Sequence, residues 1–197
     1  MDKKLYLSGL LVLVLIIAVI FLVVIMVKPG EKEVKKEIAV FETTKGNFEI
    51  ELDRNNAPIT VENFVSYVNA GFYDGTVFHR VIPDFVAQAG GFTSAGTEKS
   101  TKAPIVLESK NGLSNKVGTV AMARTNVENS ATSQFFVNLK DNGFLDYAHG
   151  NAGYAVFGTV VKGLDVIFAM AEQSTITKYG MGDWPSQDII ITKAYMK

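Results

Sequence analysis

Arg80 is the side chain of this sequence whose surroundings most call for a chemical explanation. It lies in the run FHRVIPDFVAQAGGFT, residues 78–93, among apolar and aromatic residues and without a carboxylate beside it. An arginine in apolar surroundings normally has a partner, because burying an unpaired charge is costly. Taken alone, such a residue is more commonly a snorkelling arginine at the rim of a sheet. The chemical alternative is a fixed, always protonated donor that stabilises a transition state.

The elements that must position Arg80 are two predicted strands. The apolar runs 77–82 and 85–89 are joined by Pro83-Asp84. A Pro-Asp pair between β-branched and aromatic runs is typical of a turn between antiparallel strands. The stretch is therefore predicted to be a hairpin.

The hairpin predicts which side chains accompany Arg80, because strand residues alternate between the two faces of a sheet. Phe78 is expected on the same face as Arg80, and His79 on the opposite face. With the turn centred on the Pro-Asp pair, Gln88 is expected opposite Arg80. The Arg80 guanidinium and the Gln88 side-chain amide would then lie side by side on one face of the hairpin.

The whole run resembles the signature of the cyclophilins, the peptidyl-prolyl cis-trans isomerases of the β-barrel type. The resemblance extends from about Ile38 to the C-terminus and is closest to the short-looped, bacterial-type members. It implies an isomerase without cofactors that acts on proline-containing polypeptides. Further matching motifs follow in the same order: GTVAMART at 118–125, SQFFVNL at 133–139, FLD at 144–146 and YAVFGTVVKGLDVI at 154–167.

The chemistry of X-Pro rotation suits an arginine. Amide resonance imposes a barrier of about 18–20 kcal/mol, and no bond breaks, so neither a nucleophile nor an acid–base pair is needed. A donor aimed at the prolyl nitrogen stabilises the pyramidal form that exists only during rotation, which is differential binding of the transition state.

By resemblance, Arg80 is this donor. Gln88 would hydrogen-bond the substrate backbone and help to fix Arg80, and Phe136 would form the floor of the proline pocket. Taken singly, Phe85 and Phe136 are more commonly core residues, and the ordered motifs favour the pocket. The resemblance assigns the other substrate contacts to His79, Phe85, Val86, Ala123, Arg124, Gln134, Phe144, Leu145 and Tyr154.

Three of these positions differ from many members of the family. Phe144 replaces a common tryptophan, Tyr154 a common histidine and Val86 a common methionine. Phenylalanine and tyrosine at the first two positions are familiar in bacterial-type members, so activity is expected. Weak binding of cyclosporin-like macrocycles is expected as well.

Periodicity and turn residues predict many short strands and two helices, which favours a closed antiparallel barrel over a parallel α/β sheet. The resemblance sharpens this fold to an eight-stranded barrel with a helix closing each end. Gly180-Met181-Gly182 is expected in a loop. Strands are expected at 38–43, 48–52, 77–82, 85–89, 119–123, 134–139 and 188–196, and helices at 58–71 and 163–173.

The N-terminal residues predict a membrane anchor. After a short basic head, residues 1–4, the segment 5–27 is almost unbroken in its apolar character, and as a helix it would be about 34 Å long, enough to cross a bilayer core. A cleaved signal peptide has a shorter apolar region and a small-residue cleavage site, which is missing here. Residues 28–37 are a predicted charged linker, followed by the isomerase domain, 38–197.

Two arguments on membrane sidedness disagree. Positive-inside counting slightly favours a cytoplasmic domain, because more lysines follow the apolar segment than precede it. A hydrophobic segment after a tiny basic head, however, usually acts as a signal-anchor that leaves the domain outside. We expect a single-pass protein with an extracytoplasmic domain.

Composition narrows the function classes. A net charge of −1 offers no basic surface for nucleic acid. The chain has no cysteine and two histidines, so neither disulfides nor a metal-ligand constellation is expected. An isomerase assisting folding at the membrane surface is favoured over a tethered proline-peptide binding module or holdase, because a mere binder does not need the donor that Arg80 provides. A pure scaffold is disfavoured by the intact pocket residues.

Overall fold

The computed structural model describes residues 16–17 and 36–197, and Lys36–Lys197 form one compact unit. The predicted basic head, the predicted anchor except residues 16–17, and the linker up to residue 35 lie outside the described residues. Among the residues that are described, no helix combines the length and the apolar character needed to cross a membrane.

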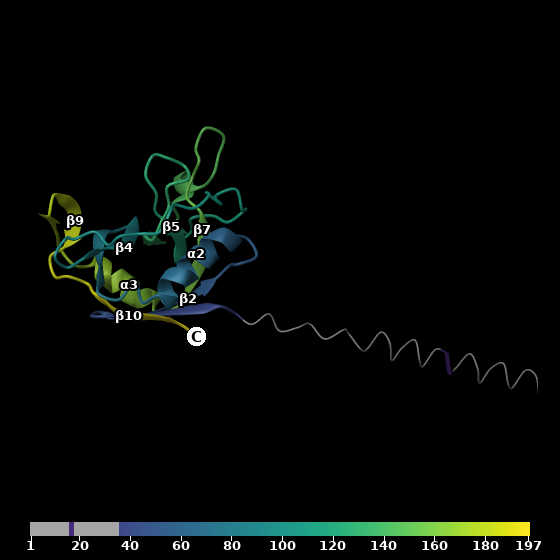
Figure 1. Cartoon of the computed structure of the whole chain (residues 1–197), viewed down its shortest axis with the longest axis horizontal. Helices are drawn as coiled ribbons and strands as arrows, with labels where there is room; N and C mark the ends of the chain where they lie inside the picture. Colours follow the sequence, from purple (N-terminus) through teal and green to yellow (C-terminus); the bar gives the residue numbers. More distant parts are fainter. Residues whose placement is uncertain (1–15, 18–35) are drawn as a thin grey trace, which may run out of the picture. The chain divides into compact units, whose positions relative to one another are not determined.

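Eight antiparallel strands form the main sheet, in the order β10-β1-β2-β7-β5-β6-β4-β3. Of these strands, Figure 1 labels β2, β4, β5, β7 and β10. They are β1 (Ile38–Thr43), β2 (Gly46–Leu52), β3 (Thr76–Ile82), β4 (Val86–Thr93), β5 (Thr119–Met122), β6 (Phe135–Asn138), β7 (Val156–Lys162) and β10 (Ile191–Met196).

The two edge strands of this sheet nearly meet. The Phe78 N–H at one edge donates to the Ile189 carbonyl at 3.0 Å. The Gly75 N–H donates to the Ile191 carbonyl at 2.8 Å. The predicted mainly β, antiparallel eight-stranded barrel is therefore confirmed, with closure that is nearly complete.

Both predicted helices are present, as α2 (Pro58–Asn69) and α3 (Leu164–Ala171), together with a short 3-10 helix, Gly143–Leu145. Proline suits the first position of α2, where its missing N–H would have no helical partner. Both α-helices bury side chains in the same core as the strands. The buried helical residues include Val61, Phe64, Val68, Ile167 and Met170.

Three sequence-based predictions need correction. The β1–β2 turn contains only Thr44 and Lys45, because pairing continues to Thr43 and Gly46. The last strand begins at Ile191 rather than at residue 188. The predicted loop at 180–182 belongs to a further hairpin, β8 (Thr175–Lys178) with β9 (Met181–Pro185). Residues 175–177 of β8 are exposed, so this strand has no apolar alternation from which it could be recognised.

Candidate active site

Arg80 begins a row of side chains that crosses five strands. It pairs with Gln88 on β4, and Gln88 pairs with Phe136 on β6. Phe136 pairs with Ala121 on β5, and Ala121 pairs with Val156 on β7. Residues directly opposite each other on antiparallel strands project to the same face. The predicted pairing of Arg80 with Gln88 is thus confirmed, and the row continues from these two polar groups onto apolar ones.

A break in the strand alternation separates Arg80 from the core. The β3–β4 register shifts between Phe78 and Arg80. Phe78 and Val81 both lie in the core cluster of the barrel, whereas the Arg80 side chain is 38% exposed. The prediction that Phe78 shares the face of Arg80 is therefore wrong, because an irregularity of this kind re-aims the following side chain.

The apolar part of the row belongs to a second cluster, separate from the core of the barrel. Phe136 is 4% exposed and forms its buried base. The buried members are Val86, Ala121, Phe136 and Val156, against which Phe85, Leu113, Ala123, Leu145 and Tyr154 pack. Six of the predicted site residues are thereby brought together. The sequence interpretation missed Leu113, Ala121 and Val156, because only the pairing of distant strands brings them here.

Aromatic rings border this cluster. Phe144 is 67% exposed and stacks on Phe85, with ring centroids 5.8 Å apart. Tyr154 meets Phe136 edge to face at 5.6 Å, and the Arg124 guanidinium lies 4.7 Å from the centre of the Tyr154 ring. The structure therefore places Phe144 against Phe85 and Tyr154 against Phe136, two different rings of the cluster.

The polar end of the row has two arrangements that the sequence did not indicate. The Gln88 side-chain amide donates to the Gln134 side-chain oxygen at 2.9 Å, and in the described structure no hydrogen bond joins Gln88 to Arg80. The Arg80 Nε instead lies 3.8 Å from an Asp183 carboxylate oxygen, and its guanidinium carbon lies 5.7 Å from the centre of the Phe85 ring. The acidic partner of Arg80 comes from β9.

Gln134 depends on a glycine beside it. A Cβ at Gly91 would lie 2.6 Å from the Gln134 side-chain nitrogen, far inside van der Waals contact. Any larger residue at position 91 would displace Gln134 and with it the amide pair to Gln88.

His79 is not brought to the groove. It is 4% exposed, and its ring packs against Phe92 at 4.8 Å and near Trp184 at 6.3 Å. Desolvation by burial, assisted by the nearby Arg80 charge, lowers the His79 pKa to about 4. His79 is therefore neutral near pH 7, and its ring lies near Phe92 of β4 and Trp184 of β9.

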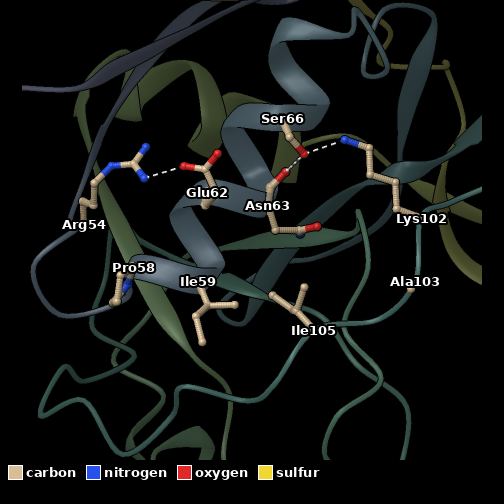
Figure 2. A pocket seen from close by; sticks show the side chains of 9 residues that line it. All are labelled: Arg54, Pro58, Ile59, Glu62, Asn63, Ser66, Lys102, Ala103 and Ile105. Carbon is tan, nitrogen blue, oxygen red and sulfur yellow. Dashed lines mark hydrogen bonds and ion pairs between the residues drawn. The ribbon is translucent and has the colours of Figure 1, made fainter.

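A hollow of about 600 Å³ lies elsewhere, beside α2 (Figure 2). Its polar side chains already bind one another: Arg54 pairs with Glu62 at 2.7 Å, and Lys102 donates to the Ser66 hydroxyl at 2.7 Å. The hollow contains none of the predicted site residues.

The row from Arg80 to Val156 joins a donor to an apolar surface, which is what a bound proline ring would require.

Comparisons with known proteins agree with this geometry. The family model described as "Cyclophilin type peptidyl-prolyl cis-trans isomerase/CLD" matches residues 38–196. A peptidyl-prolyl cis-trans isomerase of Acinetobacter baylyi is 53% identical over 156 residues, covering 79% of this chain and 82% of that protein. Peptidyl-prolyl cis-trans isomerase A of Dickeya dadantii is 50% identical over 152 residues, covering 77% and 80%.

The fold is likewise shared with a solved structure. The crystal structure of a Cryptosporidium parvum cyclophilin-type isomerase, determined in the presence of the dipeptide Ala-Pro, superposes with a TM-score of 0.70 at 23% identity. The match covers 81% of this chain and 98% of that one.

Proposed function

Because the chain belongs to the cyclophilin-type peptidyl-prolyl cis-trans isomerases, we propose that Arg80 and the apolar cluster beside it are its catalytic groove. That the chain is a peptidyl-prolyl cis-trans isomerase follows from the family and from relatives at 50% identity or more. The observation that carries the groove assignment is the cross-strand row from Arg80 through Gln88 to Phe136.

In this groove the proline ring of the substrate rests on Phe136. Val86, Leu145 and Phe85 surround the ring, and burial of these apolar surfaces supplies binding energy in both the cis and the trans forms. Binding of this kind does not itself accelerate rotation, because it stabilises ground state and transition state alike.

Arg80 supplies the interaction that is stronger in the transition state than in the ground state. Its donors lie at the end of the row, where they can approach the prolyl nitrogen as that nitrogen loses conjugation and becomes pyramidal. The Gln88–Gln134 amide pair and the backbone of Ala123 and Arg124 hold the residues before proline. One side of the X-Pro bond is thereby fixed while the other side rotates. Phe144 and Tyr154 border the bound substrate. His79 acts indirectly, by packing against the strands that carry the groove residues. An isomerase assay on Arg80→Ala and Arg80→Lys tests this assignment.

We further propose that residues 5–27 anchor the enzyme in a membrane with its domain on the extracytoplasmic side, where it assists folding of proline-containing polypeptides at the membrane surface. The length and apolar character of this segment support the proposal. The pairing of Lys36 with Glu51 at 2.8 Å and of Glu37 with Arg54 at 2.6 Å ties the last two residues of the predicted linker to the domain.

Protease accessibility tests this topology. Protease added to intact spheroplasts should cut the linker at 28–37 or remove the domain, and the purified protein should retain Met1 or Asp2. Protection of the domain until the membrane is lysed would place it in the cytoplasm. A mature N-terminus near Lys28 would identify the apolar segment as a cleaved signal peptide.

Cyclosporin is expected to inhibit this enzyme weakly, because phenylalanine at position 144 lacks the indole N–H that a tryptophan would offer to a macrocycle carbonyl. Phe144→Trp should tighten inhibition several-fold to roughly tenfold, corresponding to one net hydrogen bond of about 0.5–1.5 kcal/mol. Turnover of small proline peptides should change little, because they mainly occupy the surface above Phe136.

The matched control is Phe168→Trp, since Phe168 is also exposed, at 40%, but lies on α3 outside the apolar cluster. Titration of cyclosporin against the three proteins gives the inhibition constants. Equal constants for the wild type and Phe144→Trp would show that Phe144 does not line the groove.

A further inference from the structure

The β8–β9 hairpin brings a carboxylate to the catalytic arginine. Strand β9 packs along β3, and the Asp183 carboxylate oxygen lies 3.8 Å from the Arg80 Nε. Within the described structure this is the ion pair that Arg80 forms. The groove residues proposed above come from other elements, so the hairpin adds a component that the groove itself does not contain.

The hairpin is attached firmly enough to position a side chain. Trp184, directly after Asp183, is fully buried, and its indole N–H donates to the Asp188 carboxylate at 2.7 Å. Lys178 donates to both oxygens of the same carboxylate, at 2.8 and 3.0 Å. The Tyr179 hydroxyl donates to the Ser94 carbonyl at 3.1 Å. The hairpin is thereby connected to the segment between β9 and β10 and to the loop after β4.

The backbone at Asp183 adopts a conformation that only a few residue types tolerate well. Its φ of 59° lies in the left-handed region, which favours glycine. Glycine occupies positions 180 and 182 of the same hairpin, where an added Cβ would meet nothing within 4 Å. Aspartate is among the residues enriched in this conformation, which Tyr179 and Asp84 also adopt.

We propose that Asp183 is a positioning residue for Arg80, a role that rests on the proposed function of Arg80 as the donor. The carboxylate binds on the Nε side of the guanidinium, and the Phe85 ring lies against the same group. These two contacts restrict the plane of the guanidinium and leave its terminal N–H groups for the prolyl nitrogen. In the described structure Gln88 forms no hydrogen bond to Arg80, and its side-chain nitrogen donates to Gln134 instead.

The physical gain is preorganisation. A long side chain that is 38% exposed samples several rotamers, and only some of them direct its donors into the groove. Electrostatic stabilisation of a transition state is effective when the donor is already in place. Asp183 raises the fraction of molecules with Arg80 in the productive orientation without touching the substrate.

Asp183→Asn in the full-length chain, solubilised in detergent, tests the proposal. Asparagine tolerates the left-handed backbone, so the hairpin should be retained. We expect kcat to fall about 1.5- to fivefold, the fold-change that corresponds to the coupling energies typical of exposed ion pairs, with KM nearly unchanged. Raising the salt concentration from about 0.05 M to about 1 M should lower kcat of the wild type toward that of Asp183→Asn, because salt screens the pair.

Two controls separate positioning from a general loss of charge or structure. Asp84→Asn makes the same change at another aspartate with a left-handed φ, 55°, which lies in the β3–β4 turn and forms no ion pair with Arg80 in the described structure. It should keep the kcat and the salt response of the wild type. Asp183→Gly keeps the backbone conformation and should behave as Asp183→Asn does.

A double-mutant cycle connects the effect to Arg80. In an Arg80→Lys background, Asp183→Asn should cause no further loss of kcat, because the planar group that it positions has been removed. An equal loss in both backgrounds, or an unchanged kcat for Asp183→Asn while Arg80→Lys is impaired, overturns the positioning role and leaves the groove assignment intact. A wild-type rate for Arg80→Lys would overturn the groove assignment itself and the positioning role with it.

Discussion

Replacement of Arg80 by alanine is expected to lower kcat for X-Pro isomerisation by about 10²–10³-fold, the cost of removing one preorganised donor from a transition state. The fold should survive, because the side chain projects from the barrel beside the second apolar cluster and does not contribute to the core. Isomerase kinetics on a proline peptide, with circular dichroism of the same sample, measure both outcomes.

Arg80→Lys should also be severely impaired. Lysine keeps the charge, but its point-like ammonium does not reproduce the planar set of donors. The wild-type rate in a folded Arg80→Ala protein would exclude the proposed mechanism.

Arg54→Ala is the matched control for these variants. Arg54 lines the hollow beside α2 and pairs with Glu37 and Glu62, so its loss should reduce stability and leave kcat unchanged. Loss of activity in Arg54→Ala with wild-type activity in Arg80→Ala would transfer the site to that hollow.

Stability is expected to fall in mild acid because of His79. Burial lowers its pKa from 6.5 to about 4 in the folded protein, so between these values the unfolded chain binds more protons than the folded one. The stabilising contribution of neutral His79 is complete above about pH 6.5 and is lost as the pH falls toward about 4. Linkage with these two pKa values gives a loss of about 2 kcal/mol in the free energy of unfolding between about pH 7 and about pH 5.

Urea unfolding of the fragment 36–197, which contains the whole described core, measures this loss. His79→Leu should remove most of the pH dependence in this interval, whatever its effect on stability at pH 7. His149→Gln, a change at an exposed loop residue, should keep the pH dependence of the wild type. Equal slopes for the wild type and His79→Leu would show that His79 is not the group responsible.

The sequence by itself determined the central hairpin, both helices and the pairing of Arg80 with Gln88. These features depend on local rules that act over a few residues. A Pro-Asp turn sets the register of the strands that flank it, and a 3.6-residue apolar period marks the buried face of α2. The ordered motifs further indicated the family, and half of the twelve site residues they named meet in the second apolar cluster.

The tertiary structure alone decided how these residues are aimed and partnered. The register shift before Arg80 places Arg80 and Phe78 in different environments, and no residue type in the sequence indicates that shift. Burial of His79 depends on Phe92 and Trp184, which arrive from other strands.

Asp183 reaches Arg80 only because β9 packs along β3. Strand pairing between distant segments is governed by packing of the whole barrel rather than by local preference, so its consequences are not readable along the chain. The arginine proposed as the donor could therefore be identified from the sequence, whereas the carboxylate proposed to position it could not.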